Sequence, residues 1–429
     1  MQYIPNILFA LVLATAIFFF YKSIKTIRRN IFLGRDEDRS DRKGDRWKTM
    51  ARVALGQGKM TRRPVAGVLH IIVYVGFVLI NLEVMEIILD GLVYGGPKRM
   101  FQPFLGDLYT VAIGFFEVLA LLVLVSCAIF LVRRNIVKVK RFSGVEMTSW
   151  PKWDANLILI IEIVLMTALL VLNAVDAPLQ TSVTMPISSW IAPLFSGMSE
   201  GALHTTEVLA WWLHIIGILL FLNYVPFSKH FHIILAFPNT YYSDLTPKGE
   251  FKNMQSVTNE VNLMMDPSAV PPPADAPVET FGAKDVTDLT WKNLMDSYSC
   301  TECGRCTSVC PANQTGKLLS PRKVMMDTRD RLEEYGKNID AKEEAKNEEK
   351  DLHSYIGEEE LWACTTCNAC TDICPVNIDP MNIIYQMRQY LSMEKASAPN
   401  EWNMMSSNIE NNGAPWQFSP QDRDLWTEE

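Results

Sequence analysis

Five long apolar stretches limit how this chain can fold more than any other feature. Each could cross a bilayer as a helix, because about 20 residues at a rise of about 1.5 Å span the hydrocarbon core. The sequence therefore predicts an all-α fold that begins with a five-helix transmembrane bundle. The stretches cover Ile4–Tyr21, Val65–Leu89, Leu108–Val132, Leu157–Val175 and Thr205–Phe227.

The charges between the stretches predict an orientation. The segment before Ile4 has no basic residue, so the first stretch is expected to be a retained span with its N-terminus outside rather than a signal peptide. Segments 22–63 and 133–152 are rich in Lys and Arg and are predicted to be cytoplasmic, whereas segments 90–107 and 176–204 are poor in them. An odd number of spans then places everything after Phe227 in the cytoplasm.

Composition divides the chain into parts with different solvents, since 48% of its residues are hydrophobic and 21% are charged. The net charge of −8 argues against nucleic-acid binding. The charged run Asp327–Glu360 has almost no apolar stripe and is expected to be a solvated helix or loop. We predict a membrane domain over 1–240, a semi-rigid linker over 241–285 that includes Pro271–Pro273, a soluble domain over 286–395 and a tail over 396–429.

Eight of the nine cysteines lie in two motifs with the spacing C-x2-C-x2-C-x3-C-P. This is the pattern of two-cluster ferredoxins, in which the fourth cysteine of each motif serves the other cluster. A pair of four-thiolate zinc sites is the alternative, but zinc does not explain the third and fourth cysteines with their proline. We assign one [4Fe-4S] cluster to Cys300, Cys303, Cys306 and Cys374, and the second to Cys364, Cys367, Cys370 and Cys310.

Histidines in and beside the apolar stretches are candidate haem ligands. His70 lies one turn inside the second stretch, and ionisable groups at such depth are usually functional. His232, or else His230, follows the fifth stretch at the same predicted face, so one haem b can bridge it to His70. His214 lies deeper, where no other stretch offers a histidine, and a second haem stays open. A lone intramembrane histidine can instead be hydrogen-bonded for structural reasons or bind quinone.

At these residues the first 240 positions resemble the cytochrome b gamma subunit of respiratory nitrate reductase and its relatives. In that family the fifth span places two haem ligands eighteen positions apart, which His214 and His232 match. The second span carries two ligands ten apart; His70 matches the first, but the other position is Ile80 here. Nearby Glu83 and Glu86 could handle protons at a quinone pocket, or could be hydrogen-bonded between helices.

From Tyr298 to about Leu391 the chain resembles the dicluster subunit of heterodisulfide reductase and of anaerobic glycerol-3-phosphate dehydrogenase. Relatives that join both halves often continue into a cysteine-rich catalytic domain with CCG motifs, which this sequence lacks. The resemblance implies a cytoplasmic catalytic partner that carries such a domain. The tail, with Trp416 and Trp426, suits a docking segment, and a disordered terminus is the alternative.

These features predict a multi-pass protein of the bacterial inner membrane, with its iron-sulfur domain in the cytoplasm. It would pass electrons between the catalytic partner, two clusters, haem b and menaquinone or ubiquinone, with substrate-specific catalysis in the partner. The rival hypothesis is an iron-sulfur membrane scaffold or redox sensor without quinone chemistry.

Overall fold

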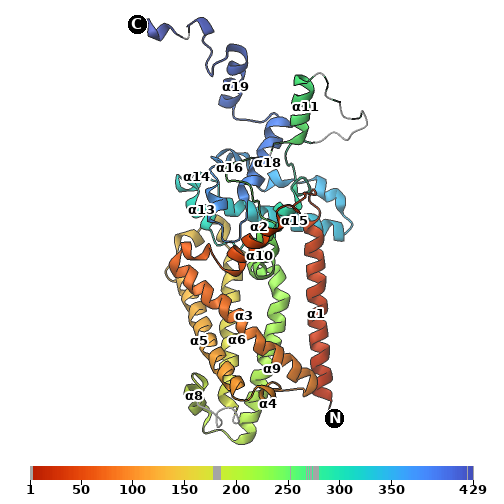
Figure 1. The fold of residues 1–429 in the computed structure, drawn as a ribbon, viewed down its shortest axis with the longest axis vertical. Helices are drawn as coiled ribbons and strands as arrows, with labels where there is room; N and C mark the ends of the chain where they lie inside the picture. Colours follow the sequence, from red (N-terminus) through yellow and green to blue (C-terminus); the bar gives the residue numbers. More distant parts are fainter. Residues whose placement is uncertain are drawn as a thin grey trace.

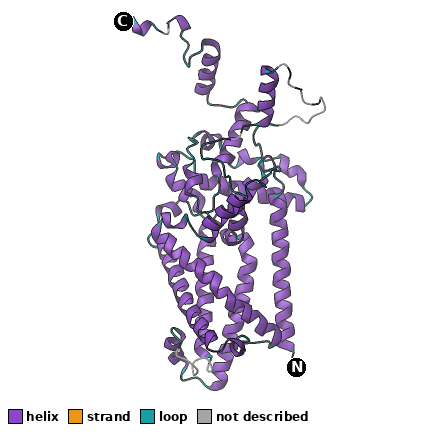
Figure 2. Cartoon of the chain, in the orientation of Figure 1, coloured by secondary structure: helices purple, strands orange, loops and turns teal. Residues whose placement is uncertain are grey.

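The computed structural model describes residues 3–428, except 177–184, 252, 267, 269, 271, 272, 274–279 and 423. The described residues form helices and no strand, which confirms the all-α prediction (Figure 2). Half of the run 264–283, including Pro271 and Pro272, lies outside the described residues.

Five helices are long and apolar enough to cross a membrane. They run side by side as one bundle, and the cysteine-bearing domain lies across one end of it (Figure 1). The predicted five-helix bundle is thereby confirmed, and its direction across the membrane stays a prediction. The five helices are α1 (Ile4–Ile31), α3 (Pro64–Val93), α5 (Asp107–Asn135), α6 (Trp150–Val175) and α9 (Glu200–Tyr224).

Shorter helices cap the bundle and build the second domain. Near the bundle ends lie α2 (Lys43–Met50), α4 (Gln102–Leu105), α8 (Ser188–Ile191) and α10 (His232–Tyr241). The second domain and the segments around it contain α11 (Gln255–Met265), α12 (Trp291–Ser299), α13 (Arg305–Val309), α14 (Pro311–Gln314), α15 (Pro321–Asp340), α16 (Glu358–Trp362), α17 (Ala369–Ile373), α18 (Pro380–Met393) and α19 (Asn400–Asn412). Helix α11 lies within the predicted linker, and α19 extends away from the domain (Figure 1).

Helix α1 continues well beyond its apolar stretch, and its polar end reaches the second domain. The Asn30 side chain donates to the Tyr298 hydroxyl at 3.1 Å, and Ile31 is buried in the core of that domain. Beyond the helix, the Arg35 amide donates to the Leu289 carbonyl at 2.8 Å. The first span is therefore attached directly to the cysteine-bearing domain.

The charged run 327–360 differs from its prediction as a solvated segment. Its first part belongs to α15, where Leu332 and Arg331 are fully buried. The Arg331 guanidinium donates to the Asp285 carboxylate at 3.0 Å, and to the carbonyls of Asn347 and Lys350. A buried charge is tolerated when it is paired in this way, so charge alone was a poor guide to exposure.

Candidate functional site: two cysteine loops above a histidine-bearing bundle

The two cysteine motifs fold into loops with the same backbone conformation. Glu302 and Gly304 in the first loop have positive φ angles, and Thr366 and Asn368 occupy the equivalent positions in the second loop with positive φ angles. Each loop then enters a short helix, α13 or α17, and these two helices pack against each other. The repeated spacing therefore produces the same local structure twice, with the two short helices in contact.

The loops bring cysteines of both motifs together, and the crossed assignment of ligands stays a prediction. Cys300, Cys303 and Cys306 line one cavity together with Cys370 and Cys374 from the other motif. Cys310 from the first motif is an electrostatic neighbour of Cys364 in the second. This cavity is the place where the first cluster would be held.

Burial raises the pKa of several of these thiols, to about 12 for Cys300 and about 11 for Cys374. Desolvation is the main cause in both cases. Thiolate ligation of iron must therefore release protons as the cluster is inserted.

Basic side chains of both domains lie close to the first loop. Arg63, just before α3, donates to the Ser308 hydroxyl at 2.8 Å. The Arg322 guanidinium donates to the Arg141 carbonyl and to the Glu146 carboxylate, at 2.6 Å each. Cations beside thiolate ligands offset the negative charge of a bound cluster, so these contacts attach the loop and tune its surroundings.

A buried ion network also joins the first loop to the histidine segment. Glu302, 3% exposed, accepts hydrogen bonds from the Lys229 ammonium and, at 2.9 Å, from the Arg329 guanidinium. Burial alone would raise the pKa of Glu302, but the charges of Lys229 and Arg329 outweigh it and lower the pKa. The Lys229 amide also donates to Asp154 of α6 at 3.0 Å. This lysine lies one helical turn before His232.

His70 and His232 face each other where the bundle meets the second domain. Their ring centres are 6.3 Å apart and their planes are tilted by 40°. Two imidazoles that share one iron have ring centres roughly 6 Å apart, since each metal–nitrogen bond is about 2 Å. His232 Nδ1 donates to the Lys229 carbonyl at 3.0 Å, and the buried His70 Nδ1 has no hydrogen-bond partner among the described residues. The pair therefore fits an axially ligated haem.

The other two candidate histidines lie differently. The His230 ring packs against Phe221 and, edge-on, against His232, so it lies beside the pair rather than opposite His70. His214 is 1% exposed, and its Nδ1 donates to the Leu165 carbonyl at 3.0 Å. It lines a second cavity, in the middle of the bundle, to which Ile80 also contributes.

Glu83 and Glu86 lie toward the other end of α3. Glu86 accepts hydrogen bonds from the Tyr109 hydroxyl and the Phe101 amide at 2.7 Å each, an arrangement that links helices. Glu83 lies 4.0 Å from Arg99, and its buried Oε2 has no partner among the described residues. Neither residue lines the cavity of His214.

The second cysteine loop lies nearer the surface and beside the tail. Cys367 is exposed. The ring of Trp362, two residues before Cys364, packs edge-on against Trp402 of α19, with ring centres 5.0 Å apart. The predicted docking tail therefore begins in contact with α16, the helix that precedes the second loop.

Sequence reasoning missed Glu162 and the pair of Lys229 with Glu302. Glu162 is the lone acidic residue of the fourth apolar stretch, which was a sufficient signal that it needed an explanation. The ion pair gave no such signal, since its members are 73 residues apart and both lie in polar segments.

A protein-family model described as a 4Fe-4S dicluster domain matches residues 299–378. The "Probable iron-sulfur-binding oxidoreductase FadF" of Bacillus subtilis is 29% identical over 456 residues, which cover 99% of this chain and 61% of the relative. The "EtfAB:quinone oxidoreductase" of Syntrophomonas wolfei is 27% identical over 407 residues, which cover 88% of this chain and 53% of the relative. An Archaeoglobus profundus protein, named as similar to one of the heterodisulfide reductase subunits, is 27% identical over 120 residues, which cover 27% of this chain and 49% of the relative.

The chain thus spans only 61% and 53% of the first two relatives. No solved structure matches it. These likenesses establish a 4Fe-4S dicluster domain and homology to heterodisulfide reductase-like iron-sulfur oxidoreductases. Together with the five apolar helices, they support a membrane-associated role in electron transfer.

Proposed function

We propose that this chain is the membrane-bound electron-transfer unit of a quinone-linked respiratory oxidoreductase. It passes electrons between a catalytic partner, its two [4Fe-4S] clusters and menaquinone or ubiquinone in the bacterial inner membrane. The iron-sulfur domain lies in the cytoplasm, where the partner, a subunit with a CCG-type cysteine-rich domain, supplies the substrate chemistry. The homology to a protein named as a quinone oxidoreductase supports the quinone part of the proposal.

The observation that carries the proposal is the facing pair of His70 and His232, which the neighbouring Lys229 links to Glu302 of the first cysteine loop. These two residues would hold a haem b, which supplies a one-electron carrier between the clusters and the bundle. The Lys229 carbonyl orients His232, while the ammonium of the same residue binds Glu302 in the cluster loop. One lysine therefore fixes the position of the histidine relative to the cysteines.

The cofactor part is tested on the full chain purified in detergent, by iron analysis and pyridine-haem quantification. We expect about eight non-haem irons and one b-type haem per chain. His70→Ala and His232→Ala should lose the haem and keep the iron. His204→Ala is the matched control, because His204 is an exposed histidine of the same bundle. A wild-type chain without haem would contradict the proposal and favour the scaffold or sensor.

The quinone part is tested by stopped-flow spectroscopy. We expect a short-chain quinone to reoxidise the dithionite-reduced chain after excess reductant is removed. A scaffold or sensor without quinone chemistry would stay reduced on the same timescale.

A further inference from the structure

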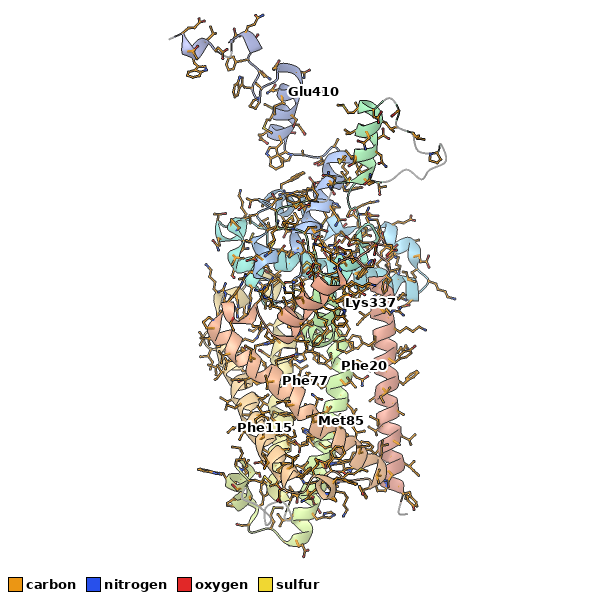
Figure 3. The ribbon with its side chains drawn as sticks, viewed as in Figure 1. Phe20, Phe77, Met85, Phe115, Lys337 and Glu410 are labelled. Atoms are coloured by element: carbon orange, nitrogen blue, oxygen red, sulfur yellow. The ribbon has the colours of Figure 1, made fainter. Side chains whose placement is uncertain are left out.

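The middle of the bundle contains a cavity of about 60 Å³ that the histidine pair does not use. This is several times the roughly 10–15 Å³ that one water needs. Its walls come from four helices and are mostly apolar. The lining includes Phe77, which lies on α3 in the middle of the bundle (Figure 3) and is 38% exposed, so the cavity reaches the outer surface of the bundle.

Two buried polar side chains line this cavity from different helices. Glu162 of α6 is 8% exposed, and no hydrogen bond or ion pair occupies its carboxylate among the described residues. His214 of α9 uses Nδ1 to donate to the Leu165 carbonyl, which leaves Nε2 as a hydrogen-bond acceptor. An unpartnered carboxyl group at such depth is costly, and such groups are usually functional.

Close helix packing keeps this site fixed in shape. A Cβ added at Gly76 would lie 2.4 Å from Val123, and one added at Gly217 would lie 2.7 Å from Leu165. A Cβ at either glycine would therefore displace the facing Val123 or Leu165 side chain. Ile80, on the wall of the cavity, offers no ligand atom to a metal.

We propose that this cavity binds the headgroup of a quinone or quinol, with hydrogen bonds to Glu162 and His214. A flat ring with a polar oxygen at each side matches a mostly apolar cavity that has two buried polar groups and the half-buried Asn81 on its lining. A quinone also arrives from the lipid phase, where the cavity opens beside Phe77. This inference rests on the proposed function and gives it a binding site.

Binding is measured with the full chain in detergent, using the fluorescence of a hydroxyquinoline N-oxide, a quinol analogue. We expect Glu162→Gln to weaken binding about tenfold, because an amide is a weaker hydrogen-bond acceptor than the carboxylate that it replaces. Ile80→Phe should abolish binding by filling the cavity. Glu207→Gln, an acidic residue of the bundle outside the cavity lining, should bind as the wild type does. Iron and haem contents identify any variant that has not folded.

A second measurement maps the site without a variant, by photolabelling with an azidoquinone and sequencing the labelled peptides. Label in α3, α6 or α9 beside the cavity supports the site, and label elsewhere overturns it. A second haem that disappears in His214→Ala would also overturn it. If quinone still reoxidises the reduced chain while Glu162→Gln and Ile80→Phe bind the analogue normally, this site is wrong and the proposed function stands. If quinone does not reoxidise the wild type, the proposed function itself fails.

Discussion

The two cysteine loops have the same spacing and the same backbone conformation, but their surroundings differ. In the first loop Glu302, Gly304 and Arg305 are buried against segments of the membrane domain. In the second loop Thr365 and Cys367 are exposed, and the neighbouring Trp362 contacts the tail. The two loops therefore share a backbone conformation but differ in their exposure to solvent. This difference suits an electron-transfer chain whose first cluster faces the bundle and whose second cluster faces a partner.

The residues that differ at equivalent positions of the two loops follow the same difference in surroundings. Gly304 stands where the second loop has Asn368, because a Cβ at Gly304 would lie 2.5 Å from Arg322 and 3.0 Å from the Arg141 carbonyl. Glu302 stands where the second loop has Thr366, because it meets Lys229 and Arg329. What distinguishes the loops is thus contact with the membrane domain, and each prediction below compares equivalent positions.

Loss of a cysteine should have the largest effect. We expect Cys303→Ser and Cys374→Ser to remove the first cluster, and Cys367→Ser and Cys310→Ser to remove the second, with iron falling from about eight to about four per chain in each. Electron paramagnetic resonance of the reduced variants should therefore group them by cluster and not by motif. If Cys310→Ser gives the same spectrum as Cys303→Ser, the crossed assignment is wrong.

Glu302→Ala should be the most damaging change outside the cysteines. It leaves the Lys229 and Arg329 cations, whose side chains are 10% and 17% exposed, without their shared carboxylate, and breaking such a pair costs up to about 3 kcal/mol. The equivalent Thr366→Ala should cost less than about 1 kcal/mol. Guanidinium unfolding in detergent, followed by cluster absorbance, compares the two. Equal midpoints would show that the first loop gains nothing from its contact with the bundle.

The sequence predicted the dicluster domain and the existence of the five spans, because both are local patterns. It could not predict the contacts that make the loops unequal, since Arg63 and Ser308, for example, are 245 residues apart. It also predicted that the first helix ends near Tyr21, where the apolar stretch ends. The helix continues beyond that point, because the polar residues that follow extend toward Tyr298 rather than into lipid. Apolar length marks the membrane crossing, whereas the end of a helix depends on what it contacts beyond the lipid.

Gly304→Ala should have an intermediate effect. The residue has a φ of +68°, so alanine adds backbone strain to the clash with Arg322 and the Arg141 carbonyl, in total about 2–3 kcal/mol. Asn368→Ala should cost about 1 kcal/mol, because only the backbone term applies at this position. The same unfolding assay measures both. A larger loss for Asn368→Ala would mean that the second loop, not the first, is the one held tightly.

The smallest difference is expected where adjacent arginines reach equivalent positions of α13 and α17. Arg62 pairs with Asp372 at 2.7 Å, while Arg63 donates to Ser308 at 2.8 Å. Hydrogen bonds from Lys248 and Arg62 lower the pKa of Asp372 to about 2. The contribution of this carboxylate to folding stability is therefore complete when the pH is above its ordinary pKa of 3.8, and it is lost as the pH falls through about 2.

At neutral pH we expect Asp372→Asn to cost less than about 1 kcal/mol, because the pair is solvent-exposed, and added salt should reduce the difference from the wild type. Ser308→Ala should cost about as much, but without that salt dependence, because its hydroxyl carries no charge. The midpoints of unfolding by urea, an uncharged denaturant, measure both at low and at high salt. If Ser308→Ala showed a salt-dependent loss of stability and Asp372→Asn showed none, the charge interaction would act at the first loop and not at the second, which would contradict this prediction.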